Sequence, residues 1–227
     1  TPMCGVPYHS CDSYIARLIA KGYKVAICEQ TEDPAQARGL VDRDIIRVIT
    51  PGTVISSSML EDSRNNYICA VYADSAAFGL CLCDISTGEM YASSFPAGEE
   101  GLGHLENELA RFHPAEAVLS SGAWNAEGLV PFLKERLGCL CENGGEARFR
   151  VGAARPLAER QFKAGLQDVP AQDEAAIQAA GGLLAYLYET QKTDLSHISA
   201  LTYYTAGQFM ELDLTARQTL ELTATMR

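Results

Sequence analysis

The chain has 227 residues, of which 47% are hydrophobic and 21% are charged, and its formal net charge is −11. This mixture excludes a disordered tail, because enough apolar surface is available to offset the entropy that is lost on ordering. No apolar run approaches the roughly 20 residues of a membrane-spanning helix, and no signal peptide is visible at the start. We therefore expect a cytoplasmic protein of one large or two smaller domains, with no membrane partner.

The first segment, residues 1–52, carries both helix and strand signals. A loop over 3–9 precedes a helix that Ser10 or Asp12 caps and Gly22 ends. A strand is predicted over 23–28. A turn or short helix then begins at Asp33-Pro34 and ends at Gly39, and a second strand over 45–49 ends at Thr50-Pro51-Gly52. A helix between strands, with no obvious core of its own, predicts half of an α/β domain.

The second segment, residues 53–170, predicts an antiparallel meander followed by alternating helices and strands. The meander consists of strands over 67–72, 78–85 and 89–95, and a helix over 102–112, a strand over 117–119, a helix over 129–137 and a last strand over 149–151 follow. This order of elements is typical of a ribonuclease-H-like α/β fold.

The third segment, residues 171–227, begins with a long helix that Asp173 can cap. Gly181-Gly182 interrupts this helix, and each Gly costs about 1 kcal/mol relative to Ala. We therefore expect another backbone to pack closely against it. Residues 202–214 predict extended or mixed structure. A further helix begins at Asp213 or Thr215 and has no stop signal before Arg227, so we expect the chain to be a piece of a longer protein.

A ribonuclease-H-like order raises the hypothesis of a nuclease, which needs several carboxylates converging on two metal ions. Asp74 follows the first strand of the meander, and Glu106 or Glu108 on the next helix is a second candidate ligand. The strand over 117–119 is followed by Ser120-Ser121, so no carboxylate stands where a third ligand is needed. We therefore favour a turn residue at Asp74 and solvated glutamates over a nuclease site.

No other motif in the sequence builds a catalytic, nucleotide-binding or metal site. The chain lacks a P-loop and a dinucleotide fingerprint, and its four histidines are scattered. Two C-x-C pairs, Cys81/Cys83 and Cys139/Cys141, could in principle bind zinc. Their spacing is shorter than usual and the first pair lies inside a predicted strand, so we favour buried, reduced thiols and expect no cofactor in these residues.

The charge is unevenly distributed along the chain. Residues 1–50 hold six basic and six acidic side chains, whereas the remaining residues hold 12 basic and 23 acidic ones. Because an acidic surface is repelled by phosphate, any contact with nucleic acid should fall within the first 50 residues. The acidic remainder is better suited to a protein partner, or it simply keeps the protein soluble.

Several motifs, all in one order, resemble bacterial MutS mismatch-repair proteins. They are Pro2-Met3-Cys4-Gly5-Val6-Pro7-Tyr8-His9, Ala26-Ile27-Cys28-Glu29-Gln30, Asp33-Pro34, Arg47-Val48-Ile49-Thr50-Pro51-Gly52-Thr53, the segment 82–88, Leu195-Ser196-His197-Ile198, and the segments 212–217 and 220–221. The resemblance is colinear and covers essentially the whole chain, which makes it far more specific than any single motif.

The resemblance implies a three-part map. Residues 1–52 correspond to the C-terminal half of the mismatch-binding domain, residues 53–170 to the connector domain with its ribonuclease-H-like fold and no nuclease activity, and residues 171–227 to the start of the core (lever) domain. It also implies that the family's Phe-x-Glu element lies upstream, and that the ATPase and dimerisation region, which uses ATP and Mg²⁺, lies downstream. The partners that it implies are mismatched double-stranded DNA, MutL and a second copy of the full-length protein.

Two functional hypotheses remain for these residues. In the first, the segment 1–50 contacts DNA. Lys24, Arg38 and Arg43 touch phosphates, and the loop with Met3, Tyr8 and His9 shapes the surface behind the family's Phe-x-Glu element. The alternative for these basic residues is that they are solvated or pair with Glu32, Asp42 and Asp44.

In the second hypothesis, the connector binds MutL and transmits nucleotide state between the DNA-reading domain and the ATPase. Such transmission requires a rigid body with mobile joints, and the candidate joints are Pro51-Gly52 and Val169-Pro170. We favour this coupling function, without catalysis, for these residues.

Overall fold

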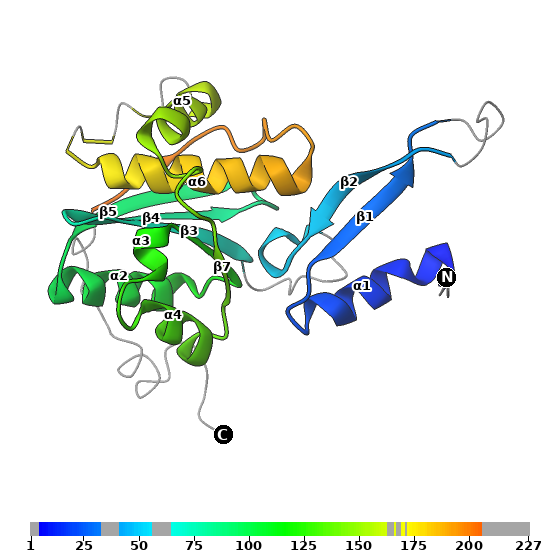
Figure 1. The fold of residues 1–227 in the computed structure, drawn as a ribbon, viewed down its shortest axis with the longest axis horizontal. Coiled ribbons are helices and arrows are strands. Elements are labelled where there is room, and N and C mark those ends of the chain that lie inside the picture. Colours follow the sequence, from blue (N-terminus) through cyan, green and yellow to red (C-terminus); the bar gives the residue numbers. More distant parts are fainter. Residues whose placement is uncertain are drawn as a thin grey trace.

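The computed structural model describes residues 5–32, 41–55, 65–162, 166, 169–170 and 172–205. Figure 1 shows a small N-terminal unit beside a larger central unit, in which helices cover both faces of a six-stranded sheet. This arrangement confirms the predicted mixed α/β fold. Among the described helices, none has the length and apolar character needed to cross a membrane. The predicted turn at Asp33-Pro34, the extended structure beyond residue 205 and the last helix lie outside the described residues.

The N-terminal unit consists of one helix packed on a two-stranded antiparallel sheet. Its elements are a short turn η1 (Tyr8–Ser10), the helix α1 (Cys11–Ile19), the strands β1 (Val25–Gln30) and β2 (Arg43–Ile49), and a short turn η2 (Pro51–Thr53). Ser10 stands at the predicted cap position, although its hydroxyl donates to the Pro7 carbonyl (3.0 Å) instead of capping α1. The chain turns at Gly22, whose φ is +77°, a value that favours glycine.

A small core holds this unit together. Within the described residues it has three buried hydrophobic side chains, Ile15, Ile49 and Val54. A β-bulge inserts Ile46 into β2 opposite the step from Ile27 to Cys28, and both Ile45 and Ile46 remain exposed. The prediction of an incomplete α/β unit agrees with this sparse core.

The central sheet has the strand order β7-β6-β3-β4-β5-β8. Its strands are β3 (Tyr67–Ala73), β4 (Ala77–Asp84), β5 (Glu89–Pro96), β6 (Glu116–Leu119), β7 (Leu140–Asn143) and β8 (Thr202–Tyr203). The first three form the predicted antiparallel meander, and β6 adds parallel to β3 on its other side. The ribonuclease-H-like order that the sequence predicts is therefore present.

Helices cover the two faces of this sheet unequally. One face carries α2 (Glu99–Phe112), α3 (Ser121–Trp124), α4 (Leu129–Pro131) and the π-helical turn η3 (Phe132–Arg136), and the other carries α5 (Val151–Phe162) and α6 (Glu174–Gln191). The layers are visible in Figure 1. Because both faces are covered, the strands are almost continuously buried, as their apolar composition requires.

One local prediction in the second segment is wrong, and two elements there, β7 and α5, were not predicted. The sequence predicts a strand over 149–151, but Phe149 lies in a turn and Val151 begins α5. The strand that does form, β7, comes earlier. The helix α5 buries small side chains, Ala154 and Ala158, together with Phe162, and it contains Pro156. Small residues and an internal proline conceal a helical period that larger apolar residues would have revealed.

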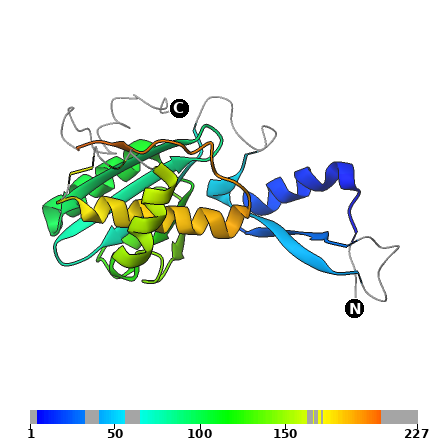
Figure 2. The same cartoon turned by 90° about the horizontal axis from the view of Figure 1, so that it is seen from above.

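The helix α6 starts where the sequence predicts, in the segment 171–227. It packs against β3 and β4 and shares their core cluster. Asp173 occupies the N-cap position without a capping bond, and its carboxylate instead accepts hydrogen bonds from Ser94 (2.7 Å) and Tyr203 (2.6 Å). In Figure 2 the C-terminal end of α6 lies next to the N-terminal unit.

The expected close approach at Gly181-Gly182 is confirmed. A Cβ atom at Gly181 would lie 2.3 Å from the carbonyl oxygen of Ala154 on α5, and one at Gly182 would lie 2.5 Å from the Phe149 ring. The absence of side chains therefore lets α5 and the preceding turn lie directly against α6.

Candidate functional site

Of the predicted DNA-contacting residues that the structure describes, Lys24 and Arg43 lie at opposite ends of the hairpin. Met3 and Arg38 lie outside the described residues, and Tyr8 and His9 belong to η1, where His9 is exposed. Lys24 immediately precedes β1, at the end of the hairpin nearest the central unit. Arg43 pairs in register with Gln30 at the opposite end of the hairpin.

Arg43 is exposed, and no ion pair within the described part of the chain involves it. The acidic residues considered as its partners are engaged elsewhere: Asp44 lies 3.8 Å from the Lys192 ammonium, and Glu32 accepts a hydrogen bond from the Asp42 backbone (2.8 Å). That Arg43 contacts a phosphate stays a prediction. The exposed position of Arg43 leaves its guanidinium accessible for such a contact.

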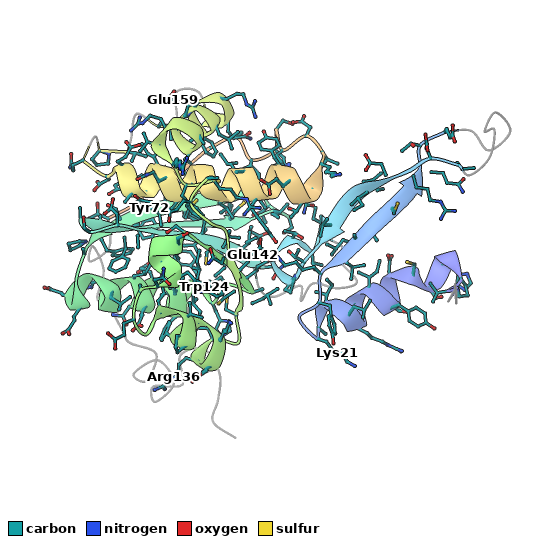
Figure 3. The ribbon with its side chains drawn as sticks, viewed as in Figure 1. Lys21, Tyr72, Trp124, Arg136, Glu142 and Glu159 are labelled. Atoms are coloured by element: carbon teal, nitrogen blue, oxygen red, sulfur yellow. The ribbon has the colours of Figure 1, made fainter. Side chains whose placement is uncertain are left out.

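Lys24 has a different environment, because its ammonium points into the boundary between the two units. It forms an ion pair with Glu142 of β7, lies 3.4 Å from Glu116 of β6 and donates to the Tyr186 hydroxyl of α6 (2.9 Å). It also lies 5.1 Å from the centroid of the Tyr186 ring. Figure 3 shows Glu142 on the side of the central unit that faces the hairpin. Lys24 therefore belongs to a junction between the units.

Glu116 is the centre of this junction. Its side chain is fully buried. One carboxylate oxygen, Oε1, accepts from the Tyr186 hydroxyl (2.6 Å) and faces Lys24, and the other, Oε2, accepts from the Thr50 hydroxyl and from the Gly52 amide (3.1 Å). Burial, followed by the charge of Glu116, raises the pKa of Tyr186, so its hydroxyl stays protonated and donates.

A second set of contacts lies beside Glu116, at the C-terminal end of α6. The Arg47 guanidinium donates to the Gln191 side chain (3.0 Å) and to the Thr53 carbonyl (3.0 Å), and burial lowers its pKa. The Gln191 amide in turn lies 3.5 Å from the Val48 carbonyl. Helix α6 thus contacts the hairpin directly, and Arg47 links it to the turn η2.

The predicted joint at Pro51-Gly52 lies inside this junction. The hydroxyl of Thr53 accepts from the Thr50 amide (2.9 Å), which closes η2 as a capping box, and Gly52 and Thr53 are buried. A Cβ atom at Gly52 would lie 2.8 Å from the Cβ atoms of both Glu116 and Ile68. The turn is therefore held by packing and hydrogen bonds, which is not the environment that a freely mobile joint needs.

The carboxylates considered for a nuclease have structural partners. Asp74 accepts hydrogen bonds from the Ala76 amide (2.8 Å), the Ala77 amide (2.9 Å) and the Tyr72 hydroxyl (3.1 Å). Burial alone would raise the pKa of Asp74, but these hydrogen bonds outweigh it and lower the pKa. This is the turn residue that the sequence predicts.

The remaining candidate ligands do not converge with Asp74. Glu108 accepts from the Tyr204 hydroxyl (2.8 Å), and burial raises the pKa of Glu106. Where a third carboxylate would be needed, the Ser120 hydroxyl caps α3 and accepts from the amides of Ala73 and Ala123, both at 3.2 Å. In the part of the chain that the structure describes, no group of three or more His, Cys, Asp or Glu side chains has the geometry to hold a metal ion.

The described cysteines are free thiols. Cys69, Cys81, Cys83 and Cys139 are buried, whereas Cys28 is exposed. Burial raises the pKa of Cys83 to about 12. These environments agree with the favoured interpretation of reduced thiols.

The sequence did not single out Glu116 or Tyr186. A signal was nevertheless present: Glu116 begins the segment Glu116-Ala117-Val118-Leu119, whose three remaining residues are all apolar and buried. A carboxylate at the start of a buried strand requires donors, although the sequence alone does not identify them.

Family models and curated relatives agree on what the chain is similar to. The model for MutS domain I matches residues 1–58, and the model for MutS domain II matches residues 66–199. DNA mismatch repair protein MutS from Ruminiclostridium cellulolyticum is 42% identical over 226 residues, and that from Acetivibrio thermocellus is 43% identical over 226 residues; each alignment covers 100% of this chain and 26% of the relative. The MutS protein from Pelotomaculum thermopropionicum is 45% identical over 225 residues, covering 98% of this chain and 26% of the relative. The chain therefore spans about a quarter of the length of these relatives.

Proposed function

The chain belongs to the MutS family, and we propose that it joins the DNA-contacting part of a mismatch-recognition protein to the remainder of that protein. The junction around Glu116 is the observation that carries this proposal. Through it, the hairpin and η2 share buried polar contacts with the sheet and with α6. A movement of the hairpin on DNA is therefore transmitted to the central unit.

The DNA-contacting surface lies on the N-terminal unit, away from the junction. Arg43, exposed at the far end of the hairpin, supplies a phosphate contact. The further DNA-contacting candidates are those from the sequence: Met3, Tyr8, His9 and Arg38. The uneven charge supports this assignment, because the acidic residues outnumber the basic ones only beyond residue 50. Lys24 contributes to the junction instead, because two carboxylates already occupy its ammonium.

The substitution Arg43→Glu in the full-length protein tests the proposed DNA contact, and Arg136→Glu is its matched control. Arg136 is exposed on the central unit and is labelled in Figure 3. Arg43→Glu should weaken binding to matched and mismatched duplexes alike and reduce the salt slope of log K by about one, whereas Arg136→Glu should leave both unchanged. A salt slope that Arg43→Glu does not alter would remove Arg43 from the contact surface.

We place the boundary of the central domain near residue 199 instead of 170, because α6 completes the cover of its sheet and the domain II match extends to that point. The acidic central domain docks MutL, and the full-length protein acts as a homodimer in the cytoplasm.

These residues perform no catalysis themselves. This part of the proposal is supported by Asp74 and Glu108, the carboxylates considered for a nuclease, because both already accept hydrogen bonds within the fold.

A further inference from the structure

We propose that Glu116 is a positioning residue, which fixes the orientation of the N-terminal hairpin on the central unit. The structural part of this inference stands on the junction geometry alone. Its consequence, that Glu116 affects DNA binding without touching DNA, rests on the proposed function.

The carboxylate of Glu116 collects donors from three separate segments of the chain. The N-terminal unit supplies Lys24 from the start of the hairpin and Thr50 and Gly52 from its end, and the central unit supplies Tyr186. Each oxygen has a different pair of partners, so the plane of the carboxylate defines where the start of β1 and the end of β2, which lie side by side, are held relative to α6.

Packing adds to this constraint. Gly52 has no side chain, and its Cα therefore lies against Glu116 and Ile68 at a distance that no Cβ would allow. The backbone of η2 has no room to slide past β6 while the carboxylate stays bonded. Gly52 and Glu116 thus define one docking geometry together.

A buried ion pair is better at specifying geometry than at adding stability. Desolvation of the carboxylate offsets much of its attraction to Lys24. If the hairpin tilts while the interface stays closed, however, a buried charge loses its donors, which is a costly state. Glu116 therefore disfavours misplaced arrangements of the two units more than it holds the units together.

Lys24 is shared between two carboxylates of unlike exposure, which provides a matched control. The side chain of Glu116 is 0% exposed, whereas that of Glu142 is 28% exposed. Removing the charge of Glu142 leaves Lys24 and all partners of Glu116 in place. Glu142→Gln should therefore have little effect, because part-exposed ion pairs contribute little.

The experiment measures amide hydrogen exchange by mass spectrometry on this chain, in the parent and in Glu116→Gln, Glu142→Gln and Lys24→Met. Glu116→Gln should accelerate exchange in residues 50–53 by about tenfold or more, because the amide group cannot satisfy all four donors. Strands β3 and β4 should retain the exchange rates of the parent. Lys24→Met, which removes the ammonium from the junction, should act in the same direction, and combining it with Glu116→Gln should give less than the product of the two effects.

Unchanged exchange in residues 50–53 of Glu116→Gln would overturn the proposal. Equal acceleration in residues 50–53 and in the central strands would also overturn it, because Glu116 would then serve only the stability of the fold. In the full-length protein, Glu116→Gln should weaken binding to a mismatched duplex by severalfold, and Glu142→Gln should not. If exchange responds as expected while affinity does not change, the geometric role stands and its link to DNA binding fails.

Discussion

Replacing Gly181 by Ala tests the packing of α5 on α6 with a single methyl group. In an open helix this substitution stabilises by about 1 kcal/mol, because Gly carries an entropic cost in the helix interior. At Gly181 the added Cβ would meet the carbonyl oxygen, Cα and carbonyl carbon of Ala154 at 2.3, 2.4 and 2.5 Å. These are backbone atoms, so no rotamer change relieves the clash.

The steric cost exceeds the gain in helix propensity. Restoring ordinary contact requires α5 to move from α6 by about 1 Å, and overpacking of this kind costs about 1–3 kcal/mol. With three backbone contacts we take the upper part of that range, which leaves a net loss of about 1–2 kcal/mol after the propensity gain. For a chain of this size the loss corresponds to a fall in Tm of about 2–8 °C.

Gly103 provides the control, because it lies inside α2 and an added Cβ there would meet no atom within 4 Å. Gly103→Ala should therefore raise Tm by about 2–4 °C. Thermal and urea unfolding followed by circular dichroism would measure both variants. Equal stabilisation by the two substitutions would refute the reasoning, because it would mean that α5 and α6 do not touch at Gly181.

Two further predictions concern titratable groups, Asp74 and Cys83 of the central unit and Cys28 of the N-terminal unit. The pKa of Asp74 is lowered in the fold from its ordinary value of 3.8, so Asp74 contributes stability above that value, and this contribution is lost as the pH falls through the lower folded value. When the urea midpoint of unfolding is measured against pH, Asp74→Asn should therefore reduce the fall of the midpoint in acid. An unaltered fall in acid, or metal-dependent DNA nicking that the variant abolishes, would contradict the role of Asp74 as a turn residue. The exposed Cys28 thiol should react with iodoacetamide at pH 8 within minutes, whereas Cys83, whose pKa burial raises to about 12, should react only after unfolding; labelling followed by mass spectrometry measures this, and equal labelling of both in the folded chain would contradict the burial.

The elements that the sequence predicted well have strong local signals. The meander from β3 to β5 consists of short apolar runs separated by turn residues such as Ser-Thr-Gly, and α6 presents large apolar residues at helical spacing between Asp173 and Gln191. The elements that it missed, α5 and β7, are short or built from alanine. Their structure depends on the surfaces that they pack against, and those surfaces form from distant parts of the chain.

In the candidate site, too, the sequence fails where a role depends on distant parts of the chain. The sequence distinguishes Lys24 from Arg43 in no way that bears on function, since both are basic residues near the start of a predicted strand, over 23–28 and 45–49 respectively. The structure separates them, because Lys24 meets two carboxylates from β6 and β7 while Arg43 remains exposed. Partners more than 90 residues away along the chain determine the role of Lys24, and no local pattern carries that information.

The unequal cores of the two units explain why the junction matters to the N-terminal unit in particular. The central unit buries two large clusters on either side of its sheet, whereas the described part of the N-terminal unit buries three hydrophobic side chains. So small a core supplies little stability of its own. The contacts of the hairpin with Glu116, Tyr186 and Gln191 therefore contribute a large share of its order. A substitution that weakens the junction should loosen the N-terminal hairpin while the central sheet keeps its stability, because both core clusters of that sheet consist of side chains from the central unit.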